Sequence, residues 1–262
     1  MANSITYVGG TYKKQFVSVF DRLTKSYSRH RVFDDFVTMA SVDLSQSARV
    51  SVGLLKDGND EQRYLSAVRR YKPDEVKGEF VEMMAALING LEHEGGDWLG
   101  DIYCRLELGD STKGQFFTPY HISGLMGEMA CGTQEDIQKH IDARGYVTVS
   151  EPCCGAGSMV IAYSETLKKA GFNPAIHLFA VAQDLSSTAA GMCHLQLSLY
   201  GIPALVMNQN SLTSDKPFWL RYTPAFYWFG WQMRLNKTPK ENSASNADSN
   251  QICDMPLFAG LS

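Results

Sequence analysis

The chain has 262 residues, of which 44% are hydrophobic and 20% are charged, as is typical of a soluble globular protein with one large or two small domains. It has no run of about 18 apolar residues, and its first residues lack the charged and apolar stretches of a secretory signal, so we expect no membrane span and a cytoplasmic location. The net charge of −4 restricts phosphate contacts to local basic patches, and the candidates are Lys13-Lys14, Arg29 with Arg31, and Arg69-Arg70 with Lys72.

Residues 1–110 have the pattern of a helical region. Apolar side chains recur at helical spacing over residues 12–23 and 33–40, and further helices are predicted over residues 61–71 and 74–91. Asp97 then has the position of an N-cap for another helix. Because strand-like alternation is weak here, we interpret residues 1–110 as a helical N-terminal region.

The pattern changes after Gly109 to alternating helices and strands. Thr118-Pro119 has the form of an N-cap followed by proline at the first helical position, and Thr133 opens another helix that ends at Gly145. Short apolar runs predict strands over residues 146–150, 177–182 and 204–207, with helices over 158–170 and 186–200 between them. This order predicts an α/β fold with parallel strands, a partial Rossmann-like core over residues 111–235.

The composition of residues 236–250 is dominated by Asn, Lys, Ser, Asp and Pro, which predicts a disordered linker within a tail of residues 236–262. A short apolar segment, Met255-Pro256-Leu257-Phe258, follows it near the end of the sequence. An apolar tip on a polar tether suits docking to a partner protein. Leu257 and Phe258 are therefore candidate partner-binding residues.

The loop Glu151-Pro152-Cys153-Cys154-Gly155-Ala156-Gly157 joins the first predicted strand to a helix. Gly155 and Gly157 permit unusual backbone angles and close approach of a ligand, and the helix offers free backbone N–H groups at its start. The loop begins with a carboxylate, and Val160 stands where a dinucleotide-binding loop has its third glycine. A carboxylate suits a cationic amino-acid group better than a phosphate, because like charges repel.

Two polar residues follow the next two predicted strands. Asp184 can accept hydrogen bonds from both hydroxyls of a ribose, or it can cap the helix that begins near Ser186. Asn210 can bond the edge of an adenine ring, or it can be a turn asparagine. Both interpretations of each residue remain open from the sequence.

The six cysteines do not form a C-x-x-C pair, and Cys153 and Cys154 are adjacent, which is poor geometry for a disulfide or zinc. We therefore expect reduced thiols and no metal site.

Two segments together, Gly114-Gln115-Phe116-Phe117-Thr118-Pro119 and the loop from Glu151 to Gly157, resemble the N6-adenine DNA methyltransferases, especially the modification subunits of type I restriction systems. The resemblance covers about residues 95–212 and implies S-adenosylmethionine as the cofactor and DNA as a partner. By position, it implies cofactor contacts from Phe117, Thr118 and Pro119 at the methionine end, from Glu151, Pro152, Gly155 and Gly157 at the amino-acid end, from Asp184 at the ribose and from Asn210 at the adenine.

One element of that family is missing. Its catalytic tetrapeptide, Asn or Asp followed by Pro-Pro and Tyr or Phe, holds the target amine and stacks on a flipped base. The chain has only Thr223-Pro224-Ala225-Phe226 in the corresponding region, and residues 213–235 are too few for the rest of a methyltransferase sheet. No catalytic residue is therefore assigned.

Two functions remain open. The protein is either a DNA adenine methyltransferase with a differently built target pocket, or an inactive protein that binds cofactor and DNA and acts through restriction-modification or replication partners. The terminal apolar segment resembles peptides that bind the bacterial sliding clamp, which is one such partner. An aromatic block next to Arg221 either stacks bases or covers the core, and we favour the core. Its members are Tyr222, Phe226, Tyr227, Trp228, Phe229 and Trp231.

Overall fold

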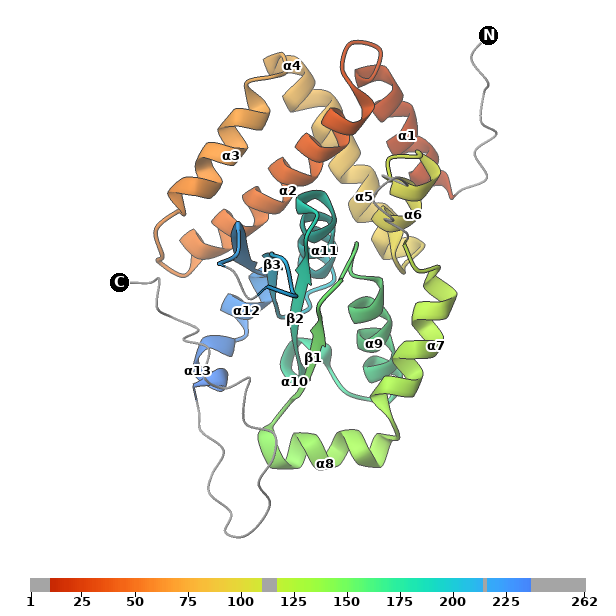
Figure 1. The fold of residues 1–262 in the computed structure, drawn as a ribbon, viewed down its shortest axis with the longest axis vertical. Coiled ribbons are helices and arrows are strands. Elements are labelled where there is room, and N and C mark those ends of the chain that lie inside the picture. The colour runs from red at the N-terminus through yellow and green to blue at the C-terminus, as the bar shows by residue number, and fades with distance from the viewer. Residues whose placement is uncertain (1–9, 110–116, 214–215, 237–262) are drawn as a thin grey trace.

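A computed structural model describes residues 10–109, 117–213 and 216–236 (Figure 1). The helical part comprises α1 (Thr11–Leu23), α2 (Arg29–Ser51), α3 (Gly58–Val68), α4 (Pro73–Glu75), a π-helical turn η1 (Val76–Phe80), α5 (Val81–His93) and α6 (Trp98–Arg105). These bounds confirm the predicted helical character of this part. Asp97 is the N-cap of α6, as expected, and its side chain accepts a hydrogen bond from the Gly100 N–H.

Aromatic side chains form the centre of the helical part. The ring of Phe16 lies 5.2 Å from that of Phe36 and 5.5 Å from that of Trp98, both edge to face. Gly90 on α5 makes room for Trp98, because a Cβ at this position would lie 2.3 Å from the indole ring. The helices therefore pack around one aromatic cluster rather than along a regular seam.

The second part contains β1 (Val147–Glu151), β2 (Leu178–Asp184), β3 (Ala204–Asn208) and β4 (Trp219–Tyr222), in the order β1-β2-β3-β4. The first three strands are parallel, which confirms the predicted α/β class, and β4 is antiparallel to β3. The helices of this part are α7 (Tyr120–Cys131), α8 (Gln134–Arg144), α9 (Ser158–Lys169), α10 (Pro174–His177), α11 (Ser187–Leu199), α12 (Pro224–Trp228) and α13 (Trp231–Leu235). The sequence did not predict β4, α10, α12 or α13.

The start of α7 differs from the expectation by one residue. Thr118 was expected at the N-cap and Pro119 at the first helical position, but Pro119 has an extended ψ of 135° and is itself the N-cap residue. Its carbonyl accepts hydrogen bonds from the N–H groups of Ile122 and Ser123. The helix therefore begins at Tyr120.

Alternate residues of the sheet face different helices. Ala180, Ala182 and Val206 pack with residues of α9 and α11. Phe179 and Met207 pack on the other face with α12 and α13. The second cluster confirms that the aromatic block covers the core: Tyr222, Phe226 and Trp231 are buried and Tyr227 packs against them, whereas Trp228 and Phe229 are exposed.

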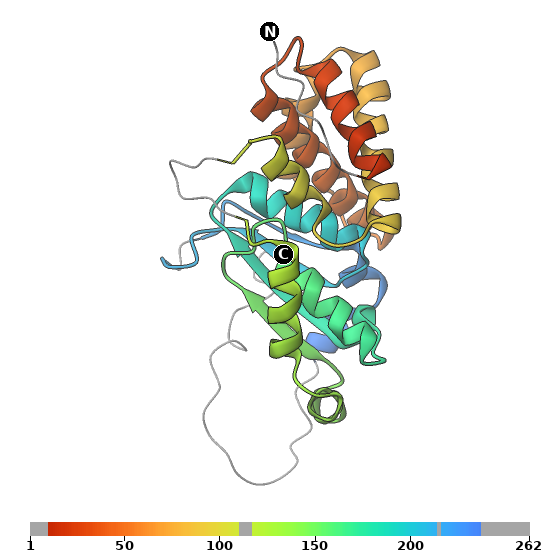
Figure 2. The same cartoon turned by 90° about the vertical axis from the view of Figure 1, so that its right-hand side faces the viewer.

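Helix α11 joins the two parts of the molecule (Figure 2). It is buried from Ala189 to Ser198 because one side packs on the sheet and the other on α2 and α6. Met192 and Leu195 belong to the same hydrophobic cluster as α1, α2, α5 and α6. None of the described helices has the length and apolarity needed to cross a membrane.

Candidate functional site

The predicted loop follows β1 and lies beside the end of β2. The Gly155 N–H donates to Asp184 Oδ2 at 2.9 Å, and the Cys154 N–H donates to the Gln183 carbonyl at 2.8 Å. The Ser186 N–H donates to Asp184 Oδ1 at 2.8 Å. Asp184 therefore fixes the glycine loop to the start of α11, while the N-cap of α11 is Ser186, whose side chain accepts from the Ala189 N–H.

Both predicted glycines are required by their surroundings. Gly155 has φ +53°, and a Cβ there would lie 3.2 Å from the ring of Phe117. Gly157 has φ +97°, and a Cβ there would lie 3.1 Å from Cys193 Sγ. These positive φ angles disfavour other residues, so the loop keeps its shape only with glycine at both positions.

Gln196 on α11 holds this loop by a hydrogen bond, and the sequence analysis did not single out this residue. Its amide N–H₂ donates to the Ala156 carbonyl at 2.8 Å and to Asp97 Oδ1 at 2.9 Å, and its oxygen accepts from the Leu99 N–H at 3.0 Å. Gln196 is completely buried. The sequence did contain a signal for this role, because Gln196 is a polar residue within an apolar helical run. Buried polar side chains are nearly always hydrogen-bonded, so such a glutamine is expected to have specific partners.

The other predicted cofactor residues lie at the same edge of the sheet. Glu151 ends β1, and its Oε1 accepts from the Cys153 N–H at 3.1 Å. Pro152, Thr118 and Pro119 are exposed. Phe117 is half-buried between Gly155 and Tyr103, with its ring centroid 5.3 Å from the tyrosine ring. Gly114, Gln115 and Phe116 lie outside the described residues.

Asn210 forms a turn in this structure, because its Oδ1 accepts from the Leu212 N–H at 3.1 Å. Its predicted contact with adenine stays a prediction. Asn208, which the sequence did not single out, is buried at the end of β3 and donates to the carbonyls of Asp184 and Leu185 at 3.0 and 2.9 Å. Asn208 thereby fixes the end of β2 next to the end of β3.

The Cys154 thiol in the loop is buried and unreactive. A hydrogen bond with Cys193, together with burial, raises the pKa of the Cys154 thiol well above its usual value. It is therefore protonated and unsuited to nucleophilic attack. The described cysteines are all free thiols. Among the described residues, no group of His, Cys, Asp and Glu side chains could hold a metal ion.

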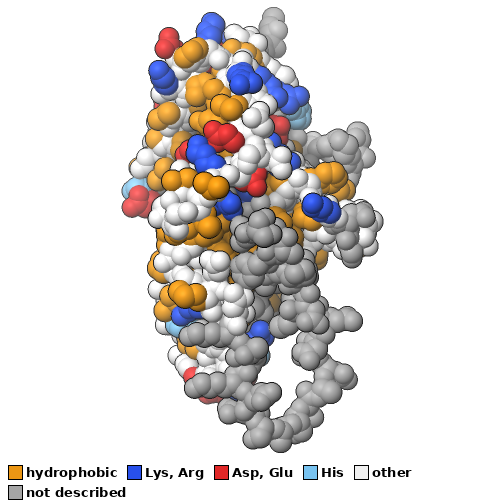
Figure 3. All heavy atoms as spheres, turned by 90° about the vertical axis from the view of Figure 1, so that its left-hand side faces the viewer, with side chains coloured by type: hydrophobic (Ala, Val, Ile, Leu, Met, Phe, Trp, Pro, Cys, Tyr) orange, Lys and Arg blue, Asp and Glu red, His pale blue; other side chains and the backbone are white. Residues whose placement is uncertain are grey.

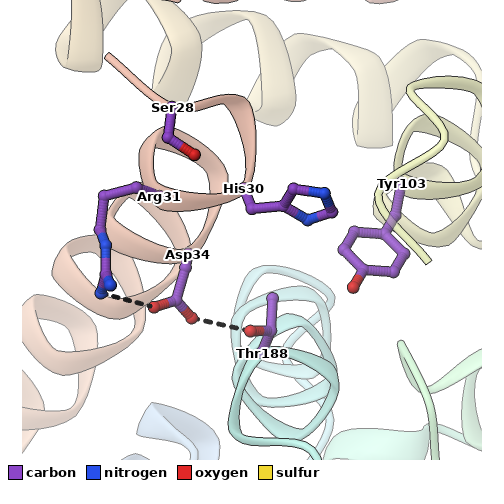
Figure 4. A pocket seen from close by; sticks show the side chains of 6 residues that line it. All are labelled: Ser28, His30, Arg31, Asp34, Tyr103 and Thr188. Atoms are coloured by element: carbon purple, nitrogen blue, oxygen red, sulfur yellow. Dashed lines mark hydrogen bonds and ion pairs between the residues drawn. The ribbon is translucent and has the colours of Figure 1, made fainter. Parts of the chain in front are cut away.

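A cleft of about 430 Å³ opens beside the loop, between the start of α2, α6 and the start of α11 (Figure 4). In Figure 4 the ring of His30 and the hydroxyl of Tyr103 point into the space next to Thr188. Thr188 Oγ1 donates to Asp34 Oδ1 at 2.7 Å, and the guanidinium of Arg31 lies 4.0 Å from the same carboxylate. Since Tyr103 contacts Phe117 and Thr188 follows Asp184 closely, the cleft adjoins the candidate cofactor site.

The predicted basic patches are mostly engaged with carboxylates. Lys13 pairs with Asp101 at 2.7 Å, and Arg70 pairs with the buried Asp35 at 2.6 Å. Figure 3 shows basic and acidic side chains interspersed over the helical part. Arg31 differs from Lys13 and Arg70, because its side chain is 56% exposed, its ion pair is long and it lines the cleft.

Thr223-Pro224-Ala225-Phe226, the segment in the region of the missing tetrapeptide, lies away from the glycine loop. The Thr223 N–H donates to the Ala204 carbonyl at 3.0 Å, and the Ala204 N–H donates to Thr223 Oγ1 at 2.9 Å. Ala204 begins β3, whereas Asn208 at its other end pairs with Asp184. The segment is therefore buried at the opposite edge of the sheet from the glycine loop, and Tyr222 is buried with it.

A glycine loop and a fixed carboxylate at the carboxyl ends of parallel strands define a nucleotide-type cofactor site. The model of the N-6 DNA methylase family matches residues 95–225, half of the chain, and the protein belongs to this family. It is thus an N6-methyltransferase-like protein whose cofactor is S-adenosylmethionine.

The chain is also similar to the type I restriction enzyme MpnII methylase subunit of Mycoplasma pneumoniae (strain ATCC 29342 / M129 / Subtype 1), with 22% identity over 233 residues. The match covers 86% of this chain and 40% of that relative. Among solved structures, a candidate class I S-adenosylmethionine-dependent methyltransferase from Listeria monocytogenes matches 85% of this chain and 69% of its own, with 13% identity and a TM-score of 0.37.

The described residues fit this cofactor. The Asp184 carboxylate accepts one backbone N–H at each oxygen, which leaves lone pairs for two hydroxyl donors. Gly155 and Gly157 both adopt positive φ angles, which give the loop a shape that lets a ligand approach its backbone closely. The carboxylate of Glu151 supplies the negative charge that an ammonium group needs.

Proposed function

We propose that this protein is the cofactor-binding part of a DNA adenine methyltransferase, and that the groups that clamp the target adenine come from elsewhere. The hydrogen bond from Gly155 to Asp184 carries this proposal, because it joins the amino-acid and ribose ends of one cofactor site. The location of Thr223-Pro224-Ala225-Phe226 at the opposite edge of the sheet supports the second half of the proposal.

S-adenosylmethionine supplies an electrophilic methyl group on a sulfonium sulfur. Glu151 and Pro152, with Gly155 and Gly157, hold its amino-acid end, and Asp184 accepts from its ribose. Phe117, Thr118 and Pro119 pack against the methionine portion, and Asn210 contacts the adenine ring. No protein nucleophile is needed, because the amine of the target base attacks the methyl group directly. What the chain contributes is orientation of the cofactor.

DNA is the proposed macromolecular partner, with the cleft beside the loop as its place of approach. Arg31 and His30 provide cationic or polar groups for a phosphate at the rim of the cleft. Restriction-modification subunits are proposed as protein partners. The candidate contact of Leu257 and Phe258 with a sliding clamp lies outside the described residues and stays a prediction, as does a cytoplasmic location.

Calorimetry with S-adenosylmethionine tests the cofactor site. We expect the native chain to bind, and Asp184→Asn and Glu151→Gln to weaken binding by about 10- to 100-fold, since a hydrogen bond to a charged group contributes about 1.5–3 kcal/mol. Glu135→Gln, a charge change in the first turn of α8, is the matched control and should leave affinity unchanged. Absence of binding by the native chain would refute the proposal.

Transfer of a labelled methyl group to adenine in duplex DNA tests the proposal that the groups that clamp the target adenine come from elsewhere. Pure protein that binds the cofactor should incorporate no label. Incorporation by pure protein, lost in Asp184→Asn, would show that this chain has a complete target pocket of another kind.

A further inference from the structure

The described segments that form the candidate cofactor site carry acidic but no strongly basic side chains. These segments are residues 117–133, 145–167 and 178–213. None of them contains a Lys or Arg, whereas Glu151 and Asp184 end β1 and β2 with carboxylates. The amino-acid end of S-adenosylmethionine has an ammonium group and an α-carboxylate, and like charges repel. The segments therefore match the ammonium group but offer no Lys or Arg for the carboxylate.

The histidines of these segments are His121 and His194. His194 is completely buried, and its ring nitrogens lie 3.1 Å from Ser41 Oγ and from the Tyr222 carbonyl. Its ring is therefore already hydrogen-bonded inside the protein. His121 is exposed on the first turn of α7, and the start of α9 offers backbone N–H groups that carry no net charge. Both are alternative partners for the carboxylate.

The cleft beside the loop brings polar side chains of the helical part to this site. In Figure 4 the ring of His30 points into the cleft, next to the hydroxyl of Tyr103. His30 lies in the first turn of α2, which contains no acidic residue and is the positive end of the helix dipole. The carboxylate in the lining, that of Asp34, accepts from Thr188 Oγ1 at 2.7 Å. His30 therefore presents a hydrogen-bond donor in surroundings that favour an anion.

Two sets of contacts place the cleft against the cofactor site. On one side Tyr103, which is only 7% exposed, packs its ring 5.3 Å from that of Phe117, and Phe117 lies against Gly155. On the other side Thr188 lies in the first turn of α11, directly after the residues that Asp184 fixes. A cofactor held by the glycine loop and by Asp184 therefore lies beside the opening of the cleft.

We propose that His30 of the helical part binds the α-carboxylate of S-adenosylmethionine, while Glu151 holds its ammonium group. This inference rests on the proposed function, because it requires the cofactor to lie on the loop between Glu151 and Asp184. An imidazole N–H donates to a carboxylate whether the ring is neutral or charged, and hydrogen bonds to a charged acceptor are among the stronger ones. Arg31 stays at the rim of the cleft, where it is available for a phosphate of DNA.

The assignment makes the helical part a determinant of cofactor specificity. Glu151 recognises the ammonium group, whereas His30 recognises only a ligand that also has the carboxylate. Each charge of the amino-acid end thus meets a side chain from a different part of the molecule, and specificity is the difference between the affinities for two ligands. A ligand that lacks only the carboxylate therefore isolates the contribution of His30.

Calorimetry of the full chain with S-adenosylmethionine and with decarboxylated S-adenosylmethionine tests the inference. His30→Leu should weaken binding of S-adenosylmethionine by about 10- to 100-fold and leave binding of the decarboxylated ligand unchanged. The two ligands differ in net charge, but this difference is the same for every variant and cancels in the ratio of the two affinity changes. His30→Gln keeps an N–H donor and should retain most of the affinity. His140→Leu, at an exposed histidine of α8, is the matched control and should change neither affinity.

The alternative outcomes are distinct. Equal weakening of both ligands by His30→Leu would show a purely structural role of His30 and overturn the inference, and unchanged binding of both ligands would overturn it as well. A selective loss of S-adenosylmethionine binding in His121→Leu, without one in His30→Leu, would assign the carboxylate to α7 instead. Failure of the native chain to bind S-adenosylmethionine refutes the proposed function, whereas native binding that is indifferent to His30 refutes only this inference.

Discussion

Arg221 on β4 and Asp60 on α3 form a two-point ion pair that joins the helical part to the edge of the sheet. The guanidinium Nε and Nη2 donate to the two carboxylate oxygens at 2.7 and 2.8 Å, and the side chains are only 3% and 7% exposed. Arg221 also donates to Ser41 Oγ at 3.0 Å. The hydroxyl of Ser41 in turn lies 3.1 Å from Nδ1 of His194, whose Nε2 lies 3.1 Å from the Tyr222 carbonyl.

Removal of one partner of this pair should strongly destabilise the protein. Burial by itself raises the pKa of Asp60, but hydrogen bonds and charge from Arg221 and Arg63 outweigh it and lower the pKa. Asp60→Ala should therefore cost about 3–5 kcal/mol, because it leaves a buried guanidinium unpaired. Urea denaturation measures this loss. Asp21→Ala, which removes an exposed ion pair with Arg29, is the control and should cost less than about 1 kcal/mol; equal costs would contradict the prediction.

The buried His194 should make stability fall in mild acid. Burial and the charge of Arg221 lower its pKa to about 3, whereas the unfolded chain has the ordinary value of about 6.5. The stabilisation is then complete above pH ~6.5 and is lost as the pH falls toward 3, which amounts to about 2 kcal/mol between pH 8 and pH 5. Chemical denaturation at both pH values measures it. His194→Gln removes the titrating group, so a variant with the same pH dependence as the native protein would refute this account.

Substitution of Gly157 should impair the cofactor loop beyond the cost of its backbone angle. Gly157→Ala combines φ +97° with a contact of 3.1 Å to Cys193 Sγ, so we expect at least about tenfold weaker cofactor binding and a stability loss of about 1–3 kcal/mol. Gly53→Ala is the matched control, because Gly53 has φ +82° and nothing within 4 Å of its Cβ position. It should lose about 1 kcal/mol of stability and keep its cofactor affinity. A similar loss of cofactor affinity in both variants would argue against cofactor binding by the loop that contains Gly157.

Gln196 should act on the cofactor through the loop that it supports. Gln196→Met keeps the size of the side chain but leaves the Ala156 carbonyl and the Leu99 N–H without their partner, at a cost of about 1–3 kcal/mol. We expect weaker cofactor binding and faster hydrogen exchange at the backbone amides of residues 154–157. Asn89→Met, at an exposed position of α5, should change neither quantity. Unchanged loop exchange in Gln196→Met would show that the loop holds its shape without this support.

Arg31 should contribute one phosphate contact if DNA enters the cleft. Arg31→Ala should lower DNA affinity and reduce the slope of log affinity against log salt by about 0.9, the value for one released counterion. Fluorescence anisotropy over a salt series measures both. Lys139→Ala removes a charge on α8 that is more exposed than Arg31 and should leave the slope unchanged. An unaltered slope in Arg31→Ala would place DNA elsewhere on the protein.

The local residue pattern was sufficient to predict the strands and helix caps that form the candidate cofactor site. The runs that became β1, β2 and β3 and the caps at Asp97 and Thr133 depend on neighbouring residues, so the sequence by itself determined them. The sequence also marked Gly155 and Gly157 as positions for unusual backbone angles, and both have positive φ. It also determined the family and its cofactor, through two motifs in a fixed order.

Only the tertiary structure decided what surrounds that site. The contact of Arg221 with Asp60 spans 161 positions, and that of Gln196 with Asp97 spans 99, distances at which no local periodicity carries information. The antiparallel pairing of β4 likewise decided that Thr223 lies at the edge opposite Asp184. The sequence left open where that segment lies, and long-range hydrogen bonding and burial, rather than residue type, decided its position.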